Sequence, residues 1–90
     1  MDPVIVINER VDVVPIFNAA ANENMLCVPW KMKYKNREII FTKLGMRHPT
    51  SKGRRMIHVF DVSDGANDYR LEFDCEHLTW TLVSMVAGDV

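Results

Sequence analysis

The stretch WKMKYKNREIIFTKL, residues 30–44, predicts the fold more clearly than any other part of the chain. Polar and apolar residues alternate on both sides of Asn36 and Arg37, and alternation with a period of two is typical of half-buried strands. Because Asn tolerates the positive φ that a two-residue hairpin loop needs, we expect a hairpin in which Lys35 pairs with Glu38.

The predicted register gives this hairpin two different faces. One face is apolar and should join the core through Met32, Tyr34, Ile39 and Phe41. The other face is exposed and carries a row of lysines, Lys31, Lys33 and Lys35. The hairpin therefore predicts a sheet with one buried face and one basic face.

Length and composition indicate a single small globular domain. The chain has 90 residues, 48% of them hydrophobic, which suits one β domain with N-terminal strands and a loop in residues 1–28 and a core meander in residues 29–86. No apolar run approaches the roughly 20 residues of a membrane helix. The start MDPVIVINER is acidic where a secretion signal is basic, so we expect a cytoplasmic protein. Cys27 and Cys75 are too few for a disulfide scaffold and should be buried or idle thiols.

The rest of the chain predicts several more short strands. Candidate strands are residues 4–7, 11–17 and 56–62, followed by a second hairpin over residues 69–85 whose loop is Asp74 to His77. Pro15 predicts an edge strand or a bulge, and residues 18–25 and 45–55 read as loops. Such a chain is typical of an all-β antiparallel meander that closes into an SH3-like barrel or roll. Its aromatic core would comprise Trp30, Tyr34, Phe41, Tyr69, Phe73 and Trp80.

The net charge of −1 hides a strong asymmetry along the sequence. Residues 1–30 carry a net charge of −3, residues 31–55 carry +8, and residues 56–90 carry −6. A phosphate or an acidic surface responds to the local potential, so the middle third predicts the partner better than the whole-chain charge does.

No constellation of side chains predicts catalysis or a cofactor. His48, His58 and His77 are spread over a loop, a strand and a turn, and Cys75 with His77 gives one poor ligand pair where structural zinc sites have two. Acids such as Asp61 with Asp64 or Asp68 lie at a turn of the kind that Asp favours for backbone reasons. We therefore expect no catalytic residues, no metal and no cofactor, and hence no enzyme.

The basic block of the middle third is the strongest functional signal. Alternate residues of one strand project about 6.6 to 7 Å apart, close to the phosphate spacing of a stretched nucleic acid strand. Lysines on an exposed strand also keep sheets soluble, and no aromatic residue on this face offers base stacking. The candidate nucleic-acid-binding residues are Lys31, Lys33, Lys35, Arg37, Lys43, Arg47, Lys52, Arg54 and Arg55.

Four segments resemble a family of small uncharacterised bacterial β-modules of about 80 residues. These segments are PWKMKYKNREIIF at 29–41, HVFDVSDG at 58–65, YRLEFD at 69–74 and LTWTL at 78–82, and the similarity spans roughly residues 11–86. Members of that family lie beside, or at the tail of, proteins that resemble error-prone DNA polymerases. The resemblance implies a small β fold and an accessory role in DNA transactions.

Three functional hypotheses follow from the sequence. The first is a non-enzymatic module that binds nucleic acid or another polyanion through the basic strand face and loop. The second is a protein interaction or homo-oligomerisation module, which uses complementary basic and acidic faces or forms a homodimer through the N-terminal strands. The third is a ligand-binding barrel whose mouth holds His58 and the turn acids.

Overall fold

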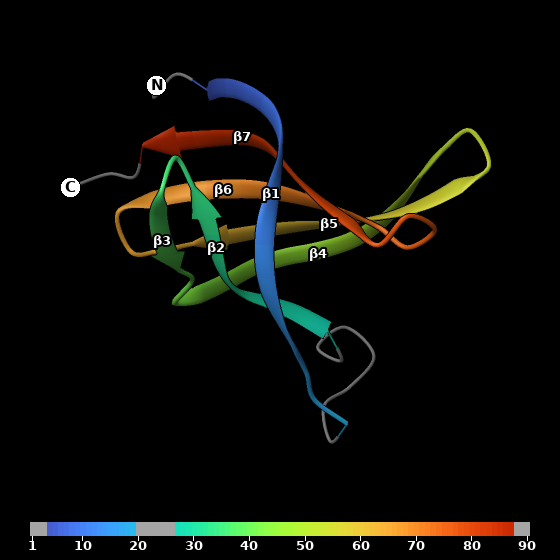
Figure 1. Cartoon of the computed structure of the whole chain (residues 1–90), viewed down its shortest axis with the longest axis horizontal. Coiled ribbons are helices and arrows are strands. Elements are labelled where there is room, and N and C mark those ends of the chain that lie inside the picture. The colour runs from blue at the N-terminus through green and yellow to red at the C-terminus, as the bar shows by residue number, and fades with distance from the viewer. Residues whose placement is uncertain (1–3, 20–26, 88–90) are drawn as a thin grey trace.

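The computed structural model describes residues 4–19 and 27–87, which form one seven-stranded antiparallel sheet (Figure 1). The prediction of an all-β antiparallel fold is confirmed. Of the loop predicted at 18–25, all but Asn18 and Ala19 lies outside the described residues. The strands are β1 (Val4–Phe17), β2 (Cys27–Tyr34), β3 (Arg37–Ile40), β4 (Lys43–Lys52), β5 (Arg55–Ser63), β6 (Asn67–Asp74) and β7 (Thr79–Ala87).

The sheet is open between β3 and β4, so the prediction of a closed barrel is wrong. The spatial order is β3-β2-β1-β7-β6-β5-β4, in which strands consecutive in the chain pair with each other except β3 and β4. Only Phe41 and Thr42 join these two strands, and neither residue favours a tight turn. The Phe41 N–H donates to the Trp30 carbonyl at 2.8 Å and the Thr42 N–H to the Ser63 carbonyl at 2.8 Å. The backbone therefore changes its hydrogen-bond partner from β2 at Phe41 to β5 at Thr42, and β3 and β4 do not form a hairpin.

Strand β1 joins the two parts of the sheet because it changes partner along its length. Residues 4–11 pair with β7 and residues 12–17 pair with β2, so β1 and β2 run across strands β4 to β7 (Figure 1). The two strands predicted here form one strand with two irregularities. The first lies between Val6 and Glu9, where Asn8 has a φ of 54°, and the second between Val14 and Pro15, where the extra residue is Trp30 of β2 and Pro15 lies in the regular count of β1.

The β2–β3 hairpin differs from its predicted register by two residues. Its turn is Lys35 and Asn36, with φ of 52° and 62°, so Tyr34 lies opposite Arg37. A shift of two residues leaves each side chain on its expected face. Lys33 is accordingly exposed and now lies opposite Glu38.

The β6–β7 hairpin shows the same kind of shift. Its loop is Cys75 to Leu78, and Leu78 adopts a positive φ of 57°. Phe73 therefore lies opposite Trp80, and a bulge beyond Leu71 brings Tyr69 opposite Met85. The apolar residues of both strands still share one face.

The prediction of a loop at residues 45–55 is wrong, because most of this segment is strand β4. Gly45 forms a bulge close to β5, where an added Cβ would lie 3.3 Å from the Asp61 carbonyl oxygen. Pro49 is tolerated because β4 pairs on one side only, with β5. The turn itself contains only Gly53 and Arg54.

The core lies between the two parts of the sheet. Its most buried large side chains are Met32, Phe60, Leu71 and Leu82. Trp80 packs against Phe60 and Phe73, with ring centroids 5.5 and 4.7 Å apart. The prediction of Trp30 as a core residue is wrong: it is 42% exposed, because it is the extra residue of the β2 bulge opposite Val14 and Pro15, and such a residue is turned out of the regular alternation.

Asp74 connects the β6–β7 loop to the β4–β5 turn. Its Oδ1 accepts the N–H groups of Glu76 at 2.9 Å and His77 at 3.2 Å, and its Oδ2 accepts Nη1 of Arg55 at 2.9 Å. The side chain of His77 lies 3.1 Å from the same Oδ2. The hydrogen bond from the His77 side chain, helped by the backbone N–H groups, lowers the pKa of Asp74.

Asp74→Asn should lower the free energy of unfolding at neutral pH and flatten its dependence on pH in acid. A carboxylate whose native pKa is depressed stabilises the fold above its ordinary pKa of 3.8, and this stabilisation is lost as the pH falls through the native value. Denaturant unfolding of parent and variant across this range measures the effect. Glu76→Gln, at an exposed neighbouring position, is the control; equal pH dependence of parent and Asp74→Asn would contradict the assignment.

Candidate functional site

The nine predicted cations do not form one continuous patch. They belong to two hairpins whose turns lie far apart, on the left and right of Figure 1. The β2–β3 hairpin carries Lys31, Lys33, Lys35 and Arg37. The β4–β5 hairpin carries Lys43, Arg47, Lys52, Arg54 and Arg55.

Several of these cations are held by partners within the chain. Lys52 Nζ lies 2.8 Å from Glu72 Oε1, and Arg55 pairs with Asp74, so acids of the last third contact cations of the middle third. Lys31 Nζ lies 3.1 Å from Glu38. Arg47 Nη2 lies 2.9 Å from His58 Nδ1. Folding therefore converts a sequence with separated charges into a surface of mixed sign.

Among the described residues, five of the predicted cations carry no ion pair: Lys33, Lys35, Arg37, Lys43 and Arg54. Lys33 has Asp12 and Glu38 opposite it on the two neighbouring strands, so its surroundings are acidic. Arg37 lies on the face of Tyr34 and not on that of Lys33, so it does not continue the row of lysines. The β2–β3 turn keeps the densest group of unpaired cations.

The first half of β1 has a free and uncharged edge. Residues 4–7, VIVI, pair with β7 on one side and have no strand on the other side in the described part of the chain. Val4, Ile5 and Val6 are all exposed, Val6 by 70%. The two edges of the whole sheet differ from this segment, because β3 contains Arg37 and Glu38 and β4 contains Pro49 and several cations. Proline and charge block edge pairing, and residues 4–7 contain neither.

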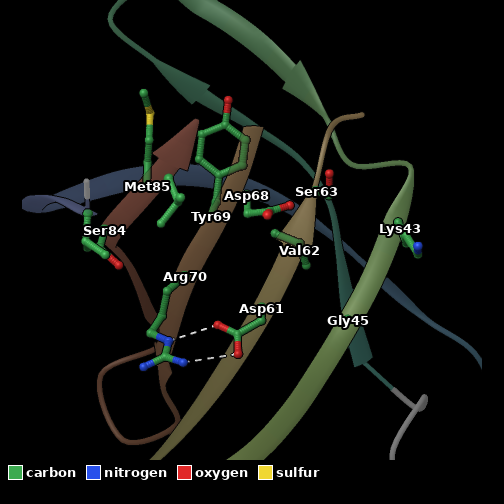
Figure 2. Close-up of a pocket in the computed structure, with 12 residues that line it drawn as sticks. Lys43, Gly45, Asp61, Val62, Ser63, Asp68, Tyr69, Arg70, Ser84 and Met85 are labelled. Carbon is green, nitrogen blue, oxygen red and sulfur yellow. Dashed lines mark hydrogen bonds and ion pairs between the residues drawn. The ribbon is translucent and has the colours of Figure 1, made fainter. Parts of the chain in front are cut away.

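A groove of about 540 Å³ adjoins this edge on the outer face of the sheet (Figure 2). Val4, Met85 and Val86 line its apolar side. Arg70 and Asp61 point toward one another across neighbouring strands, with Nε–Oδ1 at 2.8 Å and Nη2–Oδ2 at 3.2 Å. This bidentate pair raises the pKa of Arg70 and leaves little net charge in the groove.

A second hollow, of about 300 Å³, adjoins the same segment of β1. Ile5 and Ile7 line it together with Tyr34, Lys35, Arg37, Ile39, Asn67, Tyr69 and Met85. The segment of residues 4–7 therefore lies between two hollows, with Val4 lining one and Ile5 and Ile7 the other. Sequence reasoning did not find either hollow, because residues far apart in the chain line them.

Three other titratable residues considered from the sequence have shifted pKa values, namely Asp64, His58 and Cys27. Burial tends to raise the pKa of Asp64, but the backbone N–H groups of Asn67 and Ala66 and the Tyr69 hydroxyl lower it overall. His58 is half-buried, and burial followed by the Arg47 charge lowers its pKa. Burial raises the pKa of the Cys27 thiol. In residues 4–19 and 27–87, no group of three or more His, Cys, Asp or Glu side chains is arranged to hold a metal ion.

Comparison of this chain with family models, with curated proteins and with solved structures gives no match. The part of the chain that the structure describes contains no helix of the length and apolarity needed to cross a membrane.

Proposed function

We propose that this chain is a non-enzymatic interaction module that accepts a further β-strand on the free edge of β1, with a second copy of the chain as its partner. The observation that carries this proposal is the exposed, uncharged edge of residues 4–7. An added strand forms main-chain hydrogen bonds with such an edge and covers its apolar side chains.

Each face of the sheet has a hollow that contacts residues 4–7, and an added strand has side chains on both faces. Side chains alternate between the two faces of a sheet, so successive residues of an added strand face opposite sides. One set lies on the face of the sheet that carries the groove lined by Val4, and the other lies on the face that carries the hollow lined by Ile5 and Ile7. Strand addition draws its affinity mainly from main-chain hydrogen bonds, and contacts of the side chains add specificity.

A second copy suits this edge because antiparallel pairing of one segment with itself forms a symmetric, closed dimer. The segment of residues 4–7 contains no charge, so its self-pairing places no like charges opposite each other. Attraction between the basic and acidic faces of two copies supports dimerisation less than the free edge does. Ion pairs such as Lys52 with Glu72 already use these charges within one copy.

Val6→Lys should convert the dimer to a monomer, because a lysine on an edge strand opposes strand pairing and the two-fold axis brings two of them into the interface. Sedimentation equilibrium over a wide concentration range measures the dissociation constant, which we expect to rise at least about tenfold, equivalent to about 1.4 kcal/mol.

Met56→Lys is the matched control for this experiment. Met56 is 51% exposed, like the residues of the β1 edge, but it lies on β5, where it pairs with Ser51 of β4 and lies outside the proposed interface. Circular dichroism should show the same fold for both variants. A parent chain that stays monomeric at every concentration would exclude the homodimer, and a Val6→Lys variant that dimerises as the parent does would place the interface elsewhere.

A second candidate function is polyanion binding at the β2–β3 hairpin. The observation that favours it is that Lys33, Lys35 and Arg37 carry no ion pair among the described residues. Cations at one turn support contacts to a phosphate backbone without readout of the bases. The accessory role in DNA transactions that the family resemblance implies belongs to this candidate.

Single-stranded DNA binding to this hairpin should weaken with salt, with a slope of log K against log salt of about −2, because each of three phosphate contacts adds about −0.7. Fluorescence anisotropy with a labelled oligonucleotide measures the slope. Lys33→Glu with Lys35→Glu should abolish binding, whereas Arg54→Glu at the other turn should reduce it little. Absence of binding at low salt, or equal losses in both variants, would argue against this site.

A further inference from the structure

We propose that the hollow beside the β2–β3 turn binds a small organic anion with an apolar body and a carboxylate or phosphate head group. Apolar side chains line one part of this hollow and two cations line another. This proposal goes beyond strand addition and does not depend on it.

The cations come from the turn because of the observed register. Arg37 lies directly opposite Tyr34, and directly opposed residues project to the same face of a hairpin. Arg37 thus lies on the core side, at the turn end of the hairpin, where it lines the hollow with Tyr34 and Ile39. Lys35 Nζ lies 5.4 Å from the centre of the Tyr34 ring.

No carboxylate among the described residues lines this hollow to neutralise the two cations. Asp64 lies close by, but it is occupied by the Tyr69 hydroxyl at 2.9 Å and by two backbone N–H groups. Asn67 Nδ2 in turn donates to the Tyr69 hydroxyl at 3.4 Å. The polar groups of Asp64, Asn67 and Tyr69 therefore form hydrogen bonds with one another or with the backbone. Lys35 and Arg37 have no ion pair and can contact an anionic ligand.

The apolar lining excludes a bare inorganic anion as the best ligand. Ile5, Ile7, Ile39 and Met85 line the hollow, and covering apolar surface favours a ligand with its own apolar body. A volume of about 300 Å³ lies at the lower end of the range for small-molecule sites, so the body is a ring or a short chain. The larger groove of Figure 2 does not fit this ligand class, because Asp61 and Asp68 line it beside Lys43 and Arg70, and Arg70 is held by Asp61.

Phenyl phosphate and hexanoate are suitable probes. Each has a counterpart that lacks one feature: inorganic phosphate lacks the apolar body of phenyl phosphate, and neutral hexanamide lacks the charge of hexanoate. Titration followed by amide shifts in ¹H–¹⁵N spectra should give shifts that cluster at residues 34–39, 67–69 and 85 for at least one of the two organic anions. Hexanamide should bind at least about tenfold more weakly than hexanoate, since a hydrogen bond to a charged group contributes about that much. Inorganic phosphate should bind at least about tenfold more weakly than phenyl phosphate, since covering an apolar ring contributes at least that much. The stronger of the two probes identifies the head group.

Arg37→Gln should weaken binding of that probe at least about tenfold, whereas Lys33→Gln should change it less than about twofold. Both variants remove one positive charge from the same hairpin, but Lys33 projects from the opposite face. The titrations use a Val6→Lys background as well as the parent, so that failure of strand addition is distinguished from failure of this site. Equal losses in the two glutamine variants, equal binding of the counterparts, or no binding of either organic anion would overturn the proposal.

Discussion

The change of partner along β1 is the interaction on which the rest of the structure depends. Pairing with β7 and then with β2 makes one sheet from a four-stranded meander and a separate two-stranded hairpin. A lone hairpin such as β2–β3 is marginal in water, so it needs this connection and the core beneath it. Irregular backbone at Asn8 and at Pro15 flanks the point of change. The same change leaves one side of residues 4–7 without a strand in the described structure.

Sequence patterns predicted the faces of the strands better than their register or their closure. The shift of two residues in both hairpins preserved every face, because strand side chains repeat with a period of two. The register could not be predicted, because it depends on Lys35 adopting a positive φ that its residue type does not favour. Strand β4 was missed because Gly45 and Pro49 resemble loop residues, although an edge strand tolerates both.

The distribution of charge along the sequence predicted which segment carries the cations, but not which of them have acidic partners. The segment holding the cations was evident, but the partners of Lys52 and Arg55 are twenty and nineteen residues away and are brought close only by strand pairing. The position of Arg37 depends on the turn: with Lys35 and Asn36 as the turn, Arg37 becomes the first residue of β3 and lies opposite Tyr34, on the face of Ile39. The uncharged run of residues 4–7 was visible, whereas its free side depends on where β1 leaves β7.

The pairing of β1 with β7 also bears on how the chain folds. It joins residues as far apart as Val4 and Val86, whereas the hairpins within β4 to β7 join near neighbours in sequence. Closing a long loop carries an entropic cost before any contact compensates it, so local hairpins form more readily than this pairing. The first half of β1 is then the last segment to dock and the first to detach, and a transient opening there would bare Leu82 and Trp80 without disturbing the β4–β7 meander.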